Sequence, residues 1–201
     1  MSVRSPDPRT IRTVASLRSA LRELLSARSL DDVNVSELCR IADVRRTTFY
    51  THYDSVAELL TEMLTSDLDA ALDVPEIEGK SVEVIAAEFH EAVIAAFEFV
   101  VRDRQLFRVG FNSDASAPLR RALNAMFRQR VELALALWKS LGAGAETDAT
   151  AATAFAAGGL AASVEAWALS DDTDSRRWAG AVRDQMAPWW PRGEGADVTE
   201  A

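Results

Sequence analysis

The sequence predicts an all-α protein of about nine helices. Along almost all of its 201 residues, apolar side chains recur three or four positions apart, which is the period of an amphipathic helix. The alternation typical of a β-strand nowhere continues for more than four residues. Residues that favour helix starts, such as Ser55 and Ser81, stand just before periodic segments. We therefore expect helices joined by loops, and no sheet.

In the first part of the chain, local patterns favour four helices. Leucines between Leu17 and Leu25 give the first helix one apolar face, and Asn34 can cap the second. Asp43 and Val44 form the next turn, because Asp tolerates a left-handed backbone. These four helices are expected at residues 10–27, 34–42, 45–53 and 55–71.

The rest of the chain favours five more helices. Ser81 can cap the first of these, Pro118 stands in the first turn of a later one, and an acidic run at residues 171–174 suits the start of the last. These helices are expected at residues 81–101, around Phe107 and Phe111, and at 118–138, 149–169 and 175–190. Pro75 and Gly79 break the pattern between the two groups.

We expect the following domain organisation. Residues 1–54 form an N-terminal arm and a three-helix domain, and residues 55–190 form a larger helical domain in which helix 55–71 is the link. Residues 191–201 form a polar tail that we expect to be disordered.

The third helix carries two kinds of side chain. Phe49 and Tyr53, four residues apart, are expected to be buried. The other side has hydrogen-bond donors and no acid: Arg45, Arg46, Thr47, Thr48, Thr51 and His52. A short helix with an apolar anchor and a donor-rich side suits the major groove of DNA. A buried helical hairpin with incidental basic residues is the alternative.

The net charge of −9 is unevenly distributed. Residues 1–55 contain nine Arg against seven Asp and Glu, about +2, whereas the remainder has thirteen Lys and Arg against twenty-four acids, about −11. Positive charge therefore accompanies the two short helices, and the acidic bulk lies elsewhere.

Residues 34–60 resemble the DNA-binding domain of TetR (tetracycline-repressor-like) regulators, most specifically in the segment VRRTTFYTHYDS. The family's aromatic signature is similar to Tyr50, Thr51, His52 and Tyr53. Two positions depart from the family: Asp43 replaces the usual turn Gly, and Val56 replaces a phosphate-contacting Lys. At the second position, Val56 lacks the side chain that makes one backbone contact per half-site in the family.

This resemblance implies a helix-turn-helix domain followed by a ligand-binding and dimerisation domain. The implied function is a ligand-responsive transcriptional regulator, most often a repressor, that binds a palindromic operator as a homodimer. Arg46, Thr47 and Thr48 would then face base edges, Tyr50, Thr51 and His52 would contact phosphates, and Arg45 would lie near the backbone. Asn34 completes the expected DNA-binding set.

The larger domain is expected to hold an apolar or amphipathic effector and to form the dimer. The candidate pocket residues are Phe89, His90, Phe97, Phe107, Phe111, Met126, Phe127, Trp138 and Phe155. Core packing alone would also explain most of them. The candidate interface residues, in the small-residue segment AAGGLAASVEAWAL, are Gly158, Gly159, Ala162 and Trp167. Packing within one protomer is the alternative for this segment.

Other functions find little support in the sequence. It contains no GxSxG, HExxH, CxxC or Gly-rich phosphate loop, so we expect neither an enzyme nor a metal or cofactor site. Cys39 is the single cysteine, and no apolar run of about 18 residues or secretion signal occurs, which favours the cytoplasm. A helical interaction or ligand-sequestering module with a degenerate DNA-binding headpiece is the competing hypothesis.

Overall fold

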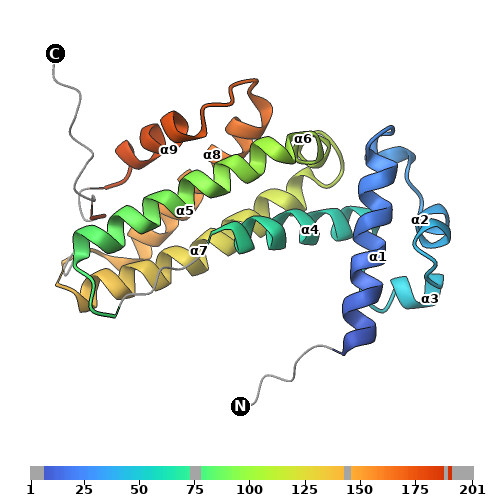
Figure 1. Ribbon diagram of the computed structural model, residues 1–201, viewed down its shortest axis with the longest axis horizontal. Coiled ribbons are helices and arrows are strands. Elements are labelled where there is room, and N and C mark those ends of the chain that lie inside the picture. Colours follow the sequence, from blue (N-terminus) through green and yellow to red (C-terminus); the bar gives the residue numbers. More distant parts are fainter. Residues whose placement is uncertain (1–6, 73–77, 143–145, 188–189, 192–201) are drawn as a thin grey trace. The chain divides into compact units, whose positions relative to one another are not determined.

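The computed structural model describes residues 7–72, 78–142, 146–187 and 190–191. Within these residues the chain forms nine α-helices and one short 3-10 helix, and no strand (Figure 1). The prediction of an all-α fold is confirmed. Most of the expected N-terminal arm, the expected break at Pro75 and nearly all of the expected tail lie outside the described residues.

The chain divides into two compact units. The first comprises the residues up to Leu64 together with Gln105–Leu119, and the second comprises Thr65–Arg104 and the residues from Arg120 onward. Helix α4 (Val56–Ala71) therefore contributes to both units.

The first unit begins with α1 (Pro8–Leu25), two residues earlier than predicted. The carboxylate of Asp7 accepts a hydrogen bond from the backbone N–H of Arg9, and Pro8 fits the first helical position. Leu17 and Leu21 are fully buried. A short 3-10 helix follows at Leu30–Asp32, and then come α2 (Val35–Ile41) and α3 (Arg46–Phe49).

An ion pair and a helix cap hold the first part of α4 in the first unit. Arg18 of α1 donates to both carboxylate oxygens of Glu62, at 2.7 and 2.8 Å. The Glu58 N–H donates to the Ser55 hydroxyl at 3.1 Å, while the Glu58 carboxylate accepts from the Asp54 N–H. This reciprocal arrangement is a capping box displaced by one residue, and it confirms the predicted cap at Ser55.

Helix α6 (Arg104–Phe111) packs tightly within the first unit. Phe107 and Phe111 are buried, and their rings stack with centroids 6.4 Å apart. A Cβ atom at Gly110 would lie 2.8 Å from a methyl group of Leu119 and 3.3 Å from one of Leu64. Glycine therefore allows the close approach of α6 to its neighbours.

The second unit contains the end of α4, α5 (Val82–Arg102), most of α7 (Ser116–Ser140), α8 (Ala149–Leu169) and α9 (Ser175–Asp184). Helix α9 packs against both α5 and α8 (Figure 1). It ends six residues before the predicted position, because the N–H groups of Gln185 and Met186 turn back to the carbonyls of Val182 and Arg183.

Trp167 is the anchor of α8 in this unit. It is fully buried, its ring stacks on Trp178 of α9 with centroids 5.1 Å apart, and its indole N–H donates to the Phe97 carbonyl of α5 at 3.0 Å. The guanidinium of Arg104 lies over the Trp167 ring, 5.4 Å from its centroid. Three helices therefore meet at one indole.

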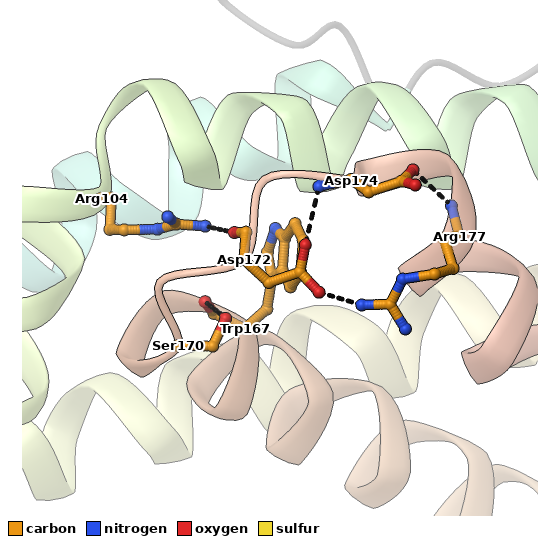
Figure 2. A network of polar contacts seen from close by, with 6 residues as sticks. All are labelled: Arg104, Trp167, Ser170, Asp172, Asp174 and Arg177. Atoms are coloured by element: carbon orange, nitrogen blue, oxygen red, sulfur yellow. Dashed lines mark hydrogen bonds and ion pairs between the residues drawn. The ribbon is translucent and has the colours of Figure 1, made fainter.

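Polar contacts hold the loop between α8 and α9 beside this indole (Figure 2). Arg104 donates to the backbone carbonyl of Asp172, and the Asp172 carboxylate accepts from the Asp174 N–H and from Arg177. Asp174 in turn caps α9 by accepting from the Arg177 N–H at 3.0 Å. The acidic run thus serves as a set of local hydrogen-bond acceptors at a helix start.

Candidate functional site

The turn between α2 and α3 has the geometry expected for a helix-turn-helix. Asn34 caps α2 by accepting from the Glu37 N–H at 3.0 Å, whereas the Glu37 carboxylate pairs with Arg28 at 2.8 Å. Asp43 has φ of +52°, and the Val44 N–H donates to the Cys39 carbonyl at 2.9 Å. This is a Schellman end, in which Asp takes the left-handed position that usually belongs to Gly.

Helix α3 is shorter than predicted. It ends at Phe49 instead of Tyr53, and the chain continues as a turn in which the Thr51 and His52 N–H groups bond to the Thr48 and Phe49 carbonyls. Phe49 is fully buried and Tyr53 is 7% exposed, as the spacing of four predicted. The Tyr53 hydroxyl donates to Glu62 at 3.3 Å, so both ends of the turn are anchored in the core.

The expected DNA-binding side chains lie together around this anchor. Arg45, Arg46, Thr47, Tyr50, Thr51 and Asn34 are exposed, and Thr48 and His52 are half-buried. Within the described part of the chain, neither Arg45 nor Arg46 forms an ion pair with a carboxylate. Their charge is therefore available to an external anion.

Two members of this set already have local hydrogen bonds. The Thr51 hydroxyl donates to the Thr48 carbonyl at 2.6 Å, so a phosphate contact from its proton would require that bond to be exchanged. The Asn34 side-chain oxygen is used by the α2 cap, which leaves only its amide N–H groups for a partner. Val56 is 8% exposed, and a buried apolar side chain cannot replace the family's Lys contact.

A separate cavity of about 90 Å³ lies within the second unit. Of the predicted pocket residues, it is lined by Phe89, His90, Phe97 and Phe127. Most of its remaining lining is aliphatic, from α5, α7, α8 and α9. The cavity is smaller than the several hundred Å³ typical of sites for drug-sized ligands.

The other predicted pocket residues are placed elsewhere. Phe107 and Phe111 belong to the first unit, because α6 packs there. Met126 is half-buried on α7 outside the cavity lining, and Trp138 is fully buried in an adjoining cluster with Ile85. Phe155 is 69% exposed on α8, so it faces away from the protomer's interior.

Two residues that line the cavity, Arg130 and Arg183, are not predicted as pocket residues by any local sequence pattern. Arg130 donates to the Asp69 carboxylate at 2.6 Å and to the backbone carbonyls of Asp69 and Leu72, at the C-terminal end of α4. Such a cap satisfies carbonyls that no helical N–H can reach. The partners lie about 60 residues away in the sequence, so no short pattern predicts this tie.

His90 gives the second unit a predicted pH dependence. Burial, followed by the charge of Arg183, lowers the pKa of His90 below its ordinary value of 6.5, with Arg176 also lowering it and Glu91 and Asp184 opposing. The unfolded chain takes up this proton more readily, so stability should decrease as the pH falls through about 6.5. The midpoint of urea unfolding should therefore decrease between about pH 7.5 and 5.5, and His90→Gln should reduce that decrease.

Carboxylates with lowered pKa do not obscure this test. Ion pairs lower the pKa of Glu91 and Glu165 below 4.5, outside that pH window. An equal decrease in the protein with and without His90 would contradict the assignment.

Helix α8 has one face that the described residues of its own protomer leave exposed. Its exposed members follow one another three or four residues apart, as one helical stripe: Phe155, Gly159, Ala162, Ala166 and Leu169. Of the predicted interface residues, Gly159 and Ala162 lie on this apolar stripe, and Gly158 is half-buried beside Asn124. Trp167 lies on the opposite side and is packed inside the protomer, which corrects its predicted place at the interface.

The composition of α8 agrees with an apolar, partly covered helix. It is the only helix of the described chain with the length and mean hydropathy of a membrane span, a property that core helices of soluble proteins share.

Among the described residues, no three His, Cys, Asp or Glu side chains gather as a metal site would require. Burial raises the pKa of the Cys39 thiol, and the charge of Arg46 opposes that rise.

Comparison with known proteins identifies the fold. No protein-family model matches the chain, and no curated protein matches it either. Among solved structures, the fatty acid degradation regulator FadR from Bacillus halodurans is similar with a TM-score of 0.61 and 16% identity, over 91% of this chain and 96% of that one. DhaS, an activator of the dihydroxyacetone kinase operon, is similar with a TM-score of 0.60 and 12% identity, over 88% and 94%.

A third similar structure carries the family name. It is the TetR family repressor AlkX from Dietzia sp. strain DQ12-45-1b, with a TM-score of 0.53 and 15% identity, over 87% of this chain and 96% of that one. The similarity extends over both units, from the helix-turn-helix through the cavity-bearing helices. This chain has the fold of the TetR-family transcriptional regulators.

Proposed function

We propose that the protein is a one-component transcriptional repressor that binds a palindromic DNA operator as a homodimer and is released by a small-molecule effector. The observation that carries this proposal is the donor set on α3 and its flanks. Arg45, Arg46 and Thr47 are exposed, while Phe49 on the other side is fully buried. A helix built in this way can enter a major groove without disturbing its own packing.

The side chains divide into two roles in this proposal. Arg46, Thr47 and Thr48 face base edges and set the operator sequence. Arg45, Tyr50, Thr51 and His52 contact the DNA backbone, with the amide of Asn34 at the start of α2. The backbone contacts dominate affinity and make it depend on salt, whereas the base contacts supply specificity.

The apolar stripe on α8 is the proposed dimer interface. Phe155 and Leu169 mark its two ends, with 69% and 44% of their surfaces exposed, and Gly159 and Ala162 leave a smooth surface between them. A second protomer related by a twofold axis would cover both copies of the stripe. Two α3 helices would then read half-sites about one helical turn apart.

Arg130 is the proposed connection between the effector and the DNA. It lines the cavity and holds the end of α4, the helix that belongs to both units. A ligand that binds preferentially to a DNA-incompatible arrangement would shift the population toward it. In this proposal the protein functions in the cytoplasm and catalyses no reaction.

Replacing Arg46 by Ala tests the operator contact. The exposed guanidinium has no carboxylate partner in the described chain, so its loss should leave stability nearly unchanged. Operator affinity should fall by about 1–3 kcal/mol, and discrimination between operator variants should weaken at one base position. Gel-shift titrations with the gene's upstream region, at two salt concentrations, measure both effects.

Tyr50→Phe is the matched control for this experiment. Tyr50 is half-exposed and its hydroxyl is assigned to a phosphate, so its removal should weaken binding to all sequences alike. If Arg46→Ala leaves operator discrimination intact, the base-reading role is refuted.

A helical interaction or ligand-sequestering module is the second candidate function. The burial of Val56, where the family has a phosphate-contacting Lys, favours it. Failure of the unliganded protein to bind duplex DNA at low salt would support this candidate over the repressor.

A further inference from the structure

The ionisable side chains that line the cavity are all basic. Among the described residues that line it, the basic side chains are His90, Arg130 and Arg183, and none of these described residues carries a carboxylate. The rest of the wall is apolar, with valine, leucine, alanine and aromatic side chains. A neutral apolar ligand would gain nothing from these three groups, and a cation would meet two guanidinium groups.

Arg130 and Arg183 differ in how far they are already satisfied. All three nitrogens of the Arg130 guanidinium donate to Asp69 or Leu72, so it has little capacity left for a ligand. Among the described residues, the buried Nε atom of Arg183 has no acceptor, and its Nη2 atom makes a long contact, 3.4 Å, to the carboxylate of Asp184. A buried N–H without a partner costs free energy that an added acceptor would recover.

His90 stands close enough to Arg183 for the two to interact electrostatically. It lies on α5, opposite the α9 helix that carries Arg183, and both line the same cavity. A neutral imidazole can donate one further hydrogen bond to an acceptor. The cavity thus presents one guanidinium and one imidazole to whatever occupies it.

We propose that the ligand of this cavity is a small amphipathic monocarboxylic acid, whose carboxylate accepts hydrogen bonds from Arg183 and His90 and whose apolar body lies along the aliphatic wall. A monoanion is preferred over a phosphate ester, because one available cation would leave the second charge of a dianion buried without compensation. The small volume of the cavity, about 90 Å³, favours a single unbranched chain over a bulkier fused-ring body. This proposal rests on the proposed function only in naming the acid as the effector.

Calorimetric titration of the full-length protein without DNA, at about pH 7.5, tests the ligand class. Octanoate is compared with 1-octanol, which has the same chain without the charge. We expect octanoate to bind at least about tenfold more tightly. Arg183→Gln should abolish that preference while leaving octanol affinity unchanged, which shows that the cavity still forms.

The matched control is Arg128→Gln, which removes an exposed arginine of α7 outside this cavity. It should keep the full preference for octanoate. Equal binding of octanoate and octanol, or an unchanged preference in Arg183→Gln, would overturn the proposal. If octanoate binds as expected but the unliganded protein does not bind operator DNA, the ligand class stands and the repressor function fails.

Discussion

Replacing Trp167 by Ala is expected to lower the free energy of unfolding by about 3–5 kcal/mol, the range for truncating a large buried aromatic side chain. The side chain is fully buried, stacks on Trp178 and is covered by the guanidinium of Arg104. Its loss would leave a cavity where α5, α8 and α9 meet. Urea unfolding, followed by far-UV circular dichroism, measures the change.

Trp167→Phe separates packing from hydrogen bonding at the same position. Phe retains much of the ring, but it removes the indole N–H that donates to the Phe97 carbonyl. The expected loss is therefore smaller, about 1–3 kcal/mol. Had Trp167 belonged to the dimer interface, Trp167→Ala would weaken dimerisation while the stability of the protomer stayed the same, and that outcome would contradict the structure.

Gly159→Leu is expected to convert the proposed dimer into monomers and, with it, to abolish operator binding. A Cβ atom at Gly159 meets nothing within 4 Å in the protomer, so the larger side chain fits without internal strain. Leu also favours a helix over Gly by roughly 0.8–1 kcal/mol, so the protomer should be no less stable. The added side chain instead stands on the smooth face that a second α8 would have to approach.

Sedimentation velocity gives the oligomeric state, and urea unfolding confirms that the protomer remains folded. Ala70→Leu is the matched control, because Ala70 is also an exposed small residue on a helix, here α4. It should leave the dimer intact. A Gly159→Leu protein that still sediments as a dimer would place the interface elsewhere.

Features specified by neighbouring residues were predictable from the sequence. The caps at Asn34, Ser55 and Ser81 depend on a side chain reaching an N–H three residues away, and all three form. The left-handed turn residue and the burial of Phe49 also follow from local pattern, because a turn type and a helical period are short-range properties. The hydrogen-bond donors of the candidate DNA-binding surface could therefore be predicted from the sequence alone.

Features that depend on distant partners were not predictable. Phe155 and Trp167 lie on the same apolar helix, and only the placement of α5 and α9 decides that Trp167 is covered and Phe155 is not. Arg130 and Arg183 read as ordinary surface arginines until the fold brings them to a cavity wall. The length of α3 was overestimated because the turn after Phe49 continues the apolar spacing without continuing the helical hydrogen bonds.

The four-residue helix α3 separates two tasks along a very short segment. Phe49 and Tyr53 are buried in the core and fix the position of the helix. Arg45, Arg46 and Thr47 are exposed, so core packing does not depend on them. In the proposed function, substitutions at those three positions would redirect the repressor to a different DNA site with little effect on folding. Duplicated copies of the gene would then diverge in operator sequence while the packing of the helices stays the same.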